Sequence, residues 1–388
     1  MSARRLSDSF RTWIEIDAKA ARRNYETFRR LLIPKTKMWS VVKSNAYGHG
    51  LFVFSKLAER MGIDGFCVDT IVEGLALRRE GIKKPILILG FTLPKFLPEA
   101  RAKNIKATIS NLEGLRAIRI VKNPPSFHIK IDSGMHRQGF FLNDIPRVIS
   151  FIKGKSSLTG RLTGIYTHFS SAKDINYPTY TEHQFQIYEK AIRLFERAGF
   201  SSRGGSASGG KDFIVHCAAT GGALLNKKYH LDAVRVGIGL FGLYPSKEFE
   251  AQLPKLHLNP VLSWRTMVTE IKNIPAGSFV GYDLAERVRR PTKVAVLPIG
   301  YWHGFPRALS SNGNVLINGR RTRVLGRVSM DLTVVDVTGI QVGSGDVVTL
   351  IGREKSHEIT AGEIADKCGT SHYEIVTRIN PLIERILV

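Results

Sequence analysis

The chain has 388 residues, of which 43% are hydrophobic and 23% are charged. That length is sufficient for two domains, and the composition is that of a folded protein, which excludes an intrinsically disordered chain. No stretch approaches the roughly 18 consecutive apolar residues of a membrane helix, and the first residues lack the apolar core of a signal peptide. The three cysteines are widely spaced and odd in number, which argues against a disulfide framework. We therefore expect a cytoplasmic protein without a membrane segment.

The formal net charge of +24 is the one unusual bulk property, because such a charge attracts nucleic acids and anionic surfaces. The basic residues are dispersed along the sequence, and no aromatic-interleaved RNA-binding motif accompanies them. We interpret the charge as a solvated surface and expect no nucleic-acid partner. A basic nucleic-acid-binding protein remains the alternative from a different functional class.

From Trp13 to about Tyr244, short apolar or β-branched runs alternate with longer amphipathic stretches, which is typical of βα units around a parallel sheet. Helix signals follow several of these runs, such as Asn111 at an expected N-terminus and Gly81 at an expected C-terminus. Eight units predict a closed (β/α)8 barrel. The eight expected strands are Met38–Val42, Gly65–Val68, Ile86–Leu89, Ala107–Ile109, Phe127–Ile131, Leu162–Thr167, Phe213–Cys217 and Ala233–Val236.

After Tyr244 the pattern changes to short alternating apolar segments separated by glycine-containing turns, with one further helix expected at Ala361–Lys367. The Gly/Ser-rich residues 201–211 fall inside the barrel pattern, so we expect a loop there. The predicted fold class is α/β, with an N-terminal (β/α)8 TIM-type barrel at residues 1–245. A mostly β domain is expected at residues 246–388.

Polar residues stand where the barrel strands are expected to end, which is where reactive side chains of such barrels project. Lys43 follows the first strand in VVKSNAYGHG, and later strands run into HIKIDSGMHR, YTH and DAVRVGIG. A lysine in this position can have its pKa depressed by desolvation and nearby cations, which makes it nucleophilic toward an aldehyde. That chemistry suits a covalent link to pyridoxal phosphate. A lysine that extends into solvent is the alternative for Lys43 considered alone.

The segment VVKSNAYGHG resembles the signature of the alanine racemase family, which belongs to the fold-type III pyridoxal-phosphate enzymes. Matching blocks follow in the same order along nearly the whole chain: KIDSGMHRQGF, GIYTHFSSA, DAVRVGIGLFGLYP, VGYD, LPIGYWHGFPR, GRVSMDLTVVDVT and TSHYE. The resemblance implies pyridoxal 5'-phosphate as cofactor and interconversion of L- and D-alanine, with D-alanine supplied to cell-wall peptidoglycan. It also implies a head-to-tail homodimer.

The resemblance makes Lys43 both the lysine that carries the cofactor and one of two catalytic bases. Racemisation needs a proton-transferring group on each face of a planar carbon, so a second base is required. Tyr282 matches the family's second base, supplied by the neighbouring subunit. A phenol with a pKa near 10 needs its anion stabilised to act near pH 7, and His168 and Arg235 are the candidates for that role.

Two further cationic residues have implied roles at the cofactor ring. Lys130 matches a lysine that the family carbamylates, a change from cation to anion that would orient Arg137 toward the cofactor's phenolic oxygen. Arg235 matches the arginine that faces the pyridine nitrogen, where a permanent cation disfavours protonation and so weakens the ring as an electron sink. A short-lived carbanion and little transamination should result. His168 matches a histidine near the same ring.

The remaining site residues are also implied by the resemblance. Backbone N–H groups of Gly237 and Ile238 would bind the cofactor phosphate together with the hydroxyls of Thr220 and Tyr373, and Tyr47 would pack beside the phosphate. Substrate contacts would come from Arg137, Tyr301 and Met330, and the partner subunit would supply the last two together with Asp331. We expect no metal site, because His49 lies between two glycines and has no second ligand at metal spacing.

The sequence departs from the family pattern at several positions. Ala219-Thr220 stands where Asn-Ser is usual, so phosphate affinity could be lower, and Trp302-His303 and Asp283 replace residues near the expected entrance. Ser329 stands where a cysteine is frequent, and Asn380-Pro381 replaces an arginine-rich ending. These changes leave the choice of substrate open more than the reaction type, so a racemase of serine, lysine or broader specificity is an alternative.

Two other pyridoxal-phosphate proteins are further alternatives. A decarboxylase of the same architecture would place an acidic residue where Arg235 stands. A non-catalytic cofactor carrier of the single-barrel type would lack the β domain and Tyr282.

Overall fold

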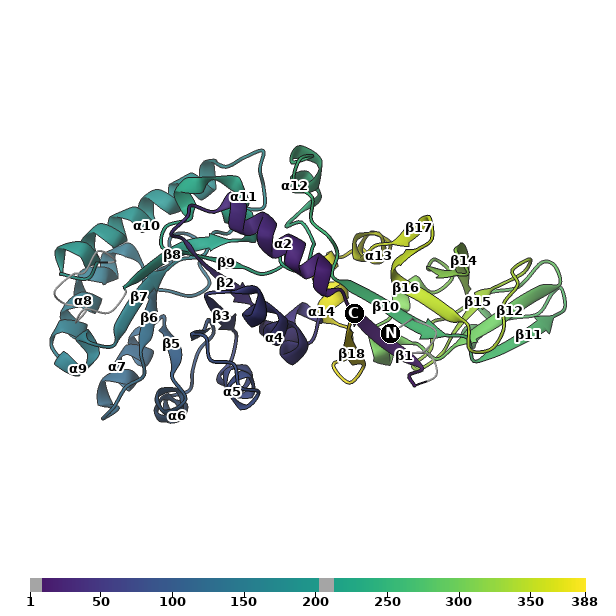
Figure 1. The fold of residues 1–388 in the computed structure, drawn as a ribbon, viewed down its shortest axis with the longest axis horizontal. Coiled ribbons are helices and arrows are strands. Elements are labelled where there is room, and N and C mark those ends of the chain that lie inside the picture. The colour runs from purple at the N-terminus through teal and green to yellow at the C-terminus, as the bar shows by residue number, and fades with distance from the viewer. Residues whose placement is uncertain (1–8, 202–212) are drawn as a thin grey trace. The chain divides into compact units, whose positions relative to one another are not determined.

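A computed structural model describes residues 9–201 and 213–388 (Figure 1). The loop expected at residues 201–211 therefore lies outside the described residues except for Ser201. The contacts divide the chain into two compact units. The barrel unit contains Arg22–Ser44 and Ser55–Asn259, and the β unit contains the chain up to Ala21, Asn45–Phe54 and Pro260–Val388.

The barrel unit contains the eight expected strands, all parallel, and pairing of the first with the last closes the barrel. Every strand end lies within two residues of its expected position, so the predicted barrel is confirmed. Most strand residues are buried, as in parallel sheets that are covered on both faces. The strands are β2 (Lys37–Val41), β3 (Gly65–Val68), β4 (Ile86–Ile88), β5 (Ile105–Ile109), β6 (Phe127–Lys130), β7 (Leu162–Tyr166), β8 (Ile214–Ala219) and β9 (Ala233–Val236).

Helices follow the barrel strands, and two of them begin at residues whose side chains accept hydrogen bonds from the first turn. Thr70 forms a capping box with Glu73, and Asn111 accepts from the Gly114 N–H, as expected from the sequence. None of the described helices has the length and apolar character needed to cross a membrane. The helices that follow β3 to β9 are α5 (Ile71–Arg79), α6 (Leu97–Ala102), α7 (Leu112–Ile120), α8 (Ile145–Lys153), α9 (Ser156–Thr159), α10 (Thr179–Arg197), α11 (Thr220–Leu225) and α12 (Lys247–Gln252).

The β unit is built on a sheet of ten strands in the order β11-β12-β15-β14-β13-β16-β10-β1-β18, with β17 paired to β16. Asn318 and Gly319, both with positive φ, form the tight turn between β13 and β14, as hairpin turns of two residues require. The strands are β1 (Thr12–Ile16), β10 (Leu262–Met267), β11 (Glu270–Ile274), β12 (Thr292–Leu297), β13 (Asn314–Ile317), β14 (Arg320–Leu325), β15 (Thr333–Asp336), β16 (Val347–Glu354), β17 (His357–Ile359) and β18 (Glu384–Leu387).

Two short helices, α13 (Ala361–Cys368) and α14 (His372–Thr377), complete the β unit. The first of them lies where the sequence predicts a helix. It begins at Thr360, whose hydroxyl accepts from the Glu363 N–H, and it ends at Gly369 in the left-handed region.

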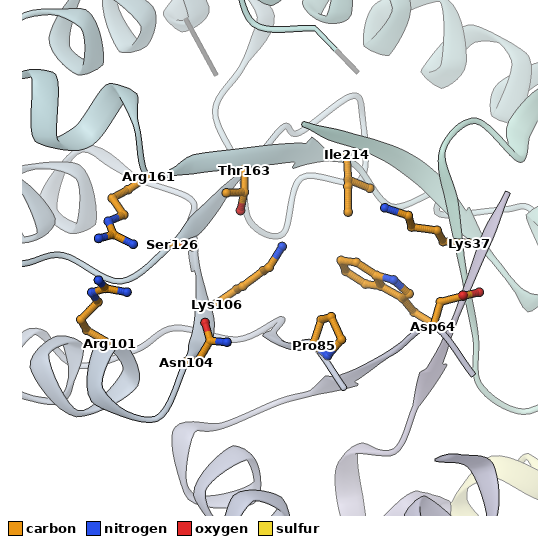
Figure 2. A pocket seen from close by; sticks show the side chains of 11 residues that line it. Lys37, Asp64, Pro85, Arg101, Asn104, Lys106, Ser126, Arg161, Thr163 and Ile214 are labelled. Atoms are coloured by element: carbon orange, nitrogen blue, oxygen red, sulfur yellow. The ribbon is translucent and has the colours of Figure 1, made fainter. Parts of the chain in front are cut away.

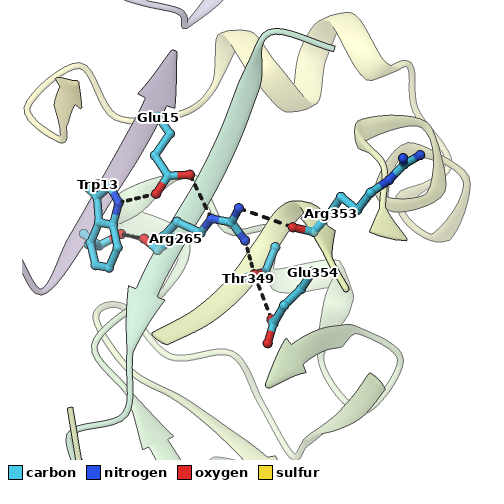
Figure 3. A network of polar contacts seen from close by, with 7 residues as sticks. Trp13, Glu15, Arg265, Thr349, Arg353 and Glu354 are labelled. Carbon is cyan, nitrogen blue, oxygen red and sulfur yellow. Dashed lines mark hydrogen bonds and ion pairs between the residues drawn. The ribbon is translucent and has the colours of Figure 1, made fainter. Parts of the chain in front are cut away.

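Strand β1 pairs within the β unit, although a single boundary near residue 245 would group it with the barrel. It lies antiparallel to β10 and parallel to β18. Figure 3 shows the polar contacts that accompany this pairing: Glu15 accepts from Trp13 Nε1 and from Arg265 Nε, both at 3.1 Å. Arg265 also bonds the Thr349 hydroxyl and the Arg353 carbonyl. The start of the chain is therefore part of the second sheet.

Candidate active site

Lys43 follows β2 at its C-terminal end and begins α3 (Lys43–Tyr47). The four residues from Ser44 to Tyr47 have φ between 52° and 56°, in the left-handed region. This backbone costs roughly 1–2 kcal/mol per residue that is not glycine, so the turn must be held by contacts around it. Strain of this kind concentrates at functional sites.

On the barrel side, the carboxylate of Glu73 holds the start of this turn. It accepts from the Ser44 N–H and from the Asp69 N–H, both at 2.7 Å, and it also caps α5. Asp69 Oδ1 lies 3.6 Å from the ammonium of Lys43, which is partly exposed. The amine of Lys43 is thus placed at the C-terminal end of the barrel strands and remains accessible.

In the β unit, the end of the same loop is held by Arg385, which donates from Nε to the Gly48 carbonyl at 3.1 Å. A Cβ at Gly48 would lie 1.9 Å from the Val376 carbonyl oxygen, so only glycine fits there. This close approach accompanies the pairing of Tyr47 with Tyr373, whose ring centroids are 6.2 Å apart. Burial, and next the neighbouring Tyr47, raise the pKa of Tyr373, so its hydroxyl stays a hydrogen-bond donor. These two expected phosphate contacts lie together.

Arg235 lies on β9 and is only 2% exposed. It donates from Nη2 to the carbonyls of Thr167 and Cys217 at 2.8 and 2.9 Å, and from Nη1 to His216 Nδ1 at 2.5 Å. These bonds leave the Nε–H and one Nη1–H without an acceptor among the described residues. A buried cation with donors to spare is suited to a ligand that offers an acceptor atom.

Two buried histidines continue the hydrogen bonding from Arg235. Arginine can only donate, so His216 Nδ1 accepts, and neutral His216 carries its proton on Nε2, which lies 2.9 Å from His128 Nδ1. Burial, and next the charge of Arg235, lower the pKa of His216 well below its ordinary value. This pair of histidines was not predicted from the sequence. The spacing of His128 and Lys130, two residues apart on one strand, could have shown that His128 faces the barrel interior as Lys130 does.

Lys130 ends β6 and is 6% exposed. Its Nζ donates to Gln138 Oε1 at 3.1 Å. Burial, followed by the charges of Arg137 and Arg235, lowers the pKa of Lys130 to about 8. A buried lysine with this pKa is neutral in roughly a tenth of the molecules at pH 7, far more than an ordinary lysine, and the neutral amine can act as a nucleophile.

Arg137 is carried by a loop that Asp132 shapes. The Asp132 carboxylate accepts four successive backbone N–H groups, from Gly134 to Arg137, at 2.9 to 3.2 Å. The Arg137 side chain itself is exposed. It is close enough to lower the pKa of both Lys130 and His168.

His168 follows β7, and its Nδ1 lies 3.4 Å from Arg235 Nη2. Burial, and then the charges of Arg235, Arg137, Lys130 and Lys43, in that order, lower its pKa well below the ordinary value. His168 is therefore neutral. The same set of charges shows that the structure brings the expected barrel residues together at one end of the strands.

The expected phosphate-binding segment follows β9. Thr220 Oγ1 accepts from the N–H groups of Gly237 and Gly239 at 3.1 and 3.4 Å, which leaves the hydroxyl proton for an acceptor. The Ile238 N–H is buried and has no acceptor among the described residues. Of the two backbone donors expected from the sequence, that of Ile238 is open and that of Gly237 is engaged by Thr220. This segment fits an anionic group such as a phosphate.

The site residues expected from the C-terminal region lie on exposed loops of the β unit. Tyr282 is 69% exposed and Met330 is 55% exposed. The backbone N–H groups of Tyr301 and Trp302 donate to the carbonyls of Ser329 and Met330, both at 3.0 Å, so Tyr301 and Met330 belong to adjoining segments. Exposed aromatic and apolar side chains gathered in this way are typical of a surface that another molecule covers.

Tyr282 stands in a strained loop. Gly281 before it has a φ of 74° and Asp283 after it has a φ of 63°. The Asp283 carboxylate lies 3.4 Å from Arg327 Nε, which helps to hold the loop. Among the described residues the Tyr282 hydroxyl has no hydrogen-bond partner, so the phenol is available to a ligand or a second chain.

Residues 9–201 and 213–388 contain no group of three or more His, Cys, Asp or Glu side chains that could hold a metal ion. An amine, a buried guanidinium, and N–H and hydroxyl groups that could hold an anion fit the functional groups of pyridoxal phosphate instead.

Comparisons with known proteins agree with the resemblance noted in the sequence. Residues 16–245 match the family described as alanine racemase, N-terminal domain, and residues 261–387 match alanine racemase, C-terminal domain. An alanine racemase of Leptospira interrogans is 36% identical over 99% of this chain and 97% of its own length. One of Methanococcus maripaludis is 35% identical over 96% and 98%. The crystal structure of alanine racemase from Bacillus anthracis with bound L-Ala-P has a TM-score of 0.89 at 31% identity, over 97% of this chain and 95% of that one.

Proposed function

Since the chain belongs to the alanine racemase family and is an enzyme that racemises alanine, we propose that it does so with Lys43 and Tyr282 as its two bases and pyridoxal phosphate as its cofactor. One base on each face of the α-carbon allows a proton to leave from one side and another to arrive on the opposite side. We further propose that the protein is cytoplasmic and that its product D-alanine supplies cell-wall peptidoglycan.

Lys43 would hold the cofactor covalently, and Arg235 would donate to its ring nitrogen. Bound pyridoxal phosphate supplies an aldehyde that condenses with amines and a ring that withdraws electrons from the α-carbon. Thr220, Ile238 and Tyr373 would donate to the phosphate, and Tyr47 would pack beside it. The observation that carries this proposal is the accessible Lys43 amine at the same strand ends as the buried, incompletely bonded Arg235 guanidinium.

Arg235 would limit side reactions. A guanidinium keeps its proton and donates to the ring nitrogen, so that nitrogen is not protonated and the ring withdraws electrons less strongly. Negative charge on the α-carbon is then short-lived and is removed by prompt reprotonation there. Arg235 thus donates to the neutral His216 and to backbone carbonyls, and no carboxylate of the described residues pairs with it.

Lys130 would be carbamylated. Its neutral amine would attack CO2, forming an N–C bond and releasing a proton, and the resulting anion would pair with Arg137. Support comes from the pKa of Lys130, about 8, and from the crowding of the unmodified ammonium by Arg137, Arg235 and Lys43. The anion would replace like-charge repulsion with attraction and would orient Arg137 toward the cofactor and the substrate.

Tyr282 would act in the active site of a second subunit, within a head-to-tail homodimer. Its exposure and that of Met330 support this role, because in a single chain these side chains remain in solvent. Tyr301 and Met330 would accompany it and contact the substrate, with Met330 near the carboxylate. Neutral His168 could share a hydrogen bond with the Tyr282 phenol and so assist proton transfer.

Turnover in deuterated water tests the proposed chemistry. The purified protein is incubated with pyridoxal phosphate and L-alanine, and chirality and isotope content are followed together. We expect D-alanine that carries deuterium at the α-carbon, since the base on the opposite face has exchanged its own proton with solvent and delivers deuterium. D-alanine that forms with no solvent deuterium, or none formed at all, would exclude the two-base mechanism.

A further inference from the structure

A pocket lies at the opposite end of the barrel strands from Lys43. Its volume is about 510 Å³, and it is lined by residues at the N-terminal ends of the strands, including Lys37 at the start of β2 and Ile214 at the start of β8. Figure 2 shows the guanidinium groups of Arg101 and Arg161 facing one another at one side of this pocket, with the amine of Lys106 extending into it. None of these residues takes part in the proposed racemase chemistry.

The charges that line the pocket are strongly unbalanced. Four cationic residues, Lys37, Arg101, Lys106 and Arg161, face a single carboxylate, that of Asp64. The Asp64 Oδ2 atom already accepts from the Met38 N–H at 2.7 Å and from Arg29 Nη1 at 3.2 Å. Its negative charge is therefore largely engaged outside the pocket lining.

The two arginines carry the positive charge at this side of the pocket without a counter-ion. Neither the Arg101 nor the Arg161 guanidinium forms a hydrogen bond or an ion pair with any described residue. Burial, followed by the charge of Arg101, lowers the pKa of Arg161. An anion held between the two groups would replace repulsion with charge-assisted hydrogen bonds, and guanidinium groups bind phosphate and carboxylate in a bidentate manner.

The pocket wall is fixed in place by Arg78. Its guanidinium donates to the carbonyls of Lys84 and Asn104 at 2.9 and 3.0 Å, and it also bonds the carbonyls of Ile82 and Lys103. These bonds tie together the two loops that bring Pro85 and Asn104 to the pocket. A wall that is held rigidly in the free protein lowers the entropic cost of binding a ligand.

The inner end of the pocket adjoins a buried polar group that has no partner. Trp39 lines the pocket, and its ring lies 5.8 Å from that of His128. His128 is fully buried, and its Nε2 has no hydrogen-bond partner among the described residues. Burial, and next the charge of Lys106, lower the pKa of His128, so the Lys106 ammonium lies close to this ring. Cationic and polar groups thus extend from the pocket mouth to the barrel interior.

We propose that this pocket binds a small oxyanion with at least two negative charges, a phosphate ester or a polycarboxylate, between Arg101 and Arg161. The volume suits a small molecule rather than a macromolecule. The hydroxyls of Ser126 and Thr163, which also line the pocket, can donate to further ligand oxygens. Because these residues lie at the other end of the strands from Lys43, the proposal does not depend on the proposed cofactor role.

Calorimetric titration of the holoenzyme with pyrophosphate, in the presence of saturating alanine, tests the proposal. The bound cofactor and alanine occupy the anion-binding groups at the other end of the strands. We expect Arg101→Gln and Arg161→Gln each to weaken pyrophosphate binding about tenfold, because each removes a charge-assisted contact. Arg289→Gln, which removes an exposed charge from the β unit, is the matched control and should bind like the native protein.

Several outcomes would overturn the proposal. They are the absence of pyrophosphate binding to the native holoenzyme, an affinity unchanged by both arginine substitutions, and displacement of pyrophosphate by alanine. Binding of a short DNA duplex that requires Arg101 and Arg161, without binding of any small anion, would also overturn it in favour of nucleic acid. A parallel titration with citrate distinguishes phosphate esters from polycarboxylates. The pocket prefers phosphates if pyrophosphate binds more tightly and requires both arginines, and it prefers polycarboxylates if citrate does.

Melting temperatures measured without added anion check the fold of the variants. We expect Arg101→Gln and Arg161→Gln to melt at or above the native temperature, because each relieves repulsion between like charges. Arg161→Lys provides a second test if the glutamine variant does not fold. It keeps the charge but loses the bidentate geometry, so we expect binding to weaken severalfold.

Discussion

The C-terminal end of the barrel and the exposed loops of the β unit differ in how completely the chain itself prepares them. In the barrel, Arg235 and Lys130 are almost fully buried, and their charges shift the pKa values of neighbouring groups. In the β unit, Tyr282 and Met330 are largely exposed. A buried cation destabilises the fold unless an anion or a hydrogen-bond acceptor compensates its charge. Exposed aromatic and apolar side chains instead leave apolar surface in contact with water. The proposed function predicts this difference, because a cofactor would bind at the barrel end and a second subunit would cover the loops.

The largest expected effect is that of removing the barrel amine. Lys43→Ala should reduce racemisation by at least about 10⁴-fold, because it removes both the covalent anchor and one base. The visible absorbance of the bound cofactor should disappear with it. The substitution would therefore remove the function of the barrel end while leaving the exposed loops intact.

Lys122→Ala is the matched control for this variant, since Lys122 is an exposed lysine between α7 and β6. It should retain both the absorbance and the activity. If Lys43→Ala kept the same visible band as the native protein, Lys43 would not be the cofactor lysine.

Removing the phenol from the exposed loops should have the next largest effect. Tyr282→Phe deletes one hydroxyl that has no hydrogen-bond partner among the described residues, so the fold should be unaffected. We expect racemisation to slow by about 10² to 10⁴, the usual contribution of a general acid or base. The cofactor absorbance should remain, because the barrel end is intact.

Tyr177→Phe, at another exposed tyrosine, should leave turnover unchanged and serves as the control. Turnover of Tyr282→Phe within twofold of native would remove Tyr282 from the mechanism. The two regions differ most clearly in this comparison, because Lys43→Ala should lose the cofactor whereas Tyr282→Phe should lose only proton transfer.

The smallest of these effects concerns Lys130. The pKa of Lys130 lies at about 8, so its amine becomes charged as the pH falls through 8, and a charged amine cannot react with CO2. At constant dissolved CO2, the ratio of carbamylated to unmodified Lys130 should fall at least about tenfold for each pH unit below 8. Mass spectrometry of the intact protein would measure the added CO2, and activity should follow it.

Lys130→Arg keeps a cation but cannot be carbamylated, so its activity should be about tenfold lower and insensitive to CO2. A native enzyme that shows neither added mass nor any response to CO2 would contradict the carbamylation proposal. The buried charges of the barrel end would then need another counter-ion.

The sequence predicts the barrel well because each strand is a short apolar run followed by a helix signal, and both are local properties. The ends of strands β2 to β9 lie within two residues of their predicted positions, and Asn111 caps α7 as predicted. The helix at Ala361 was located equally well. The residues expected at the barrel site also lie together, as the charges acting on His168 indicate.

Features that depend on long-range pairing could not be predicted from local patterns. The five residues of β1 are mostly apolar and largely buried, and nothing in them specifies pairing with β10 and β18 rather than with the barrel. Arg385 stands near the end of the chain, yet it holds the loop at Gly48. The buried bond between His128 and His216 joins residues 88 apart in sequence.

Paired inactive variants test most directly whether one active site is shared between two subunits. Chains carrying Lys43→Ala and Tyr282→Phe would be co-expressed with different affinity tags, and the heterodimer would be isolated with both tags. One of its two sites would then contain Lys43 from one chain and Tyr282 from the other, so we expect about half the activity of the native dimer. A heterodimer as inactive as its two parents would contradict a site shared between subunits.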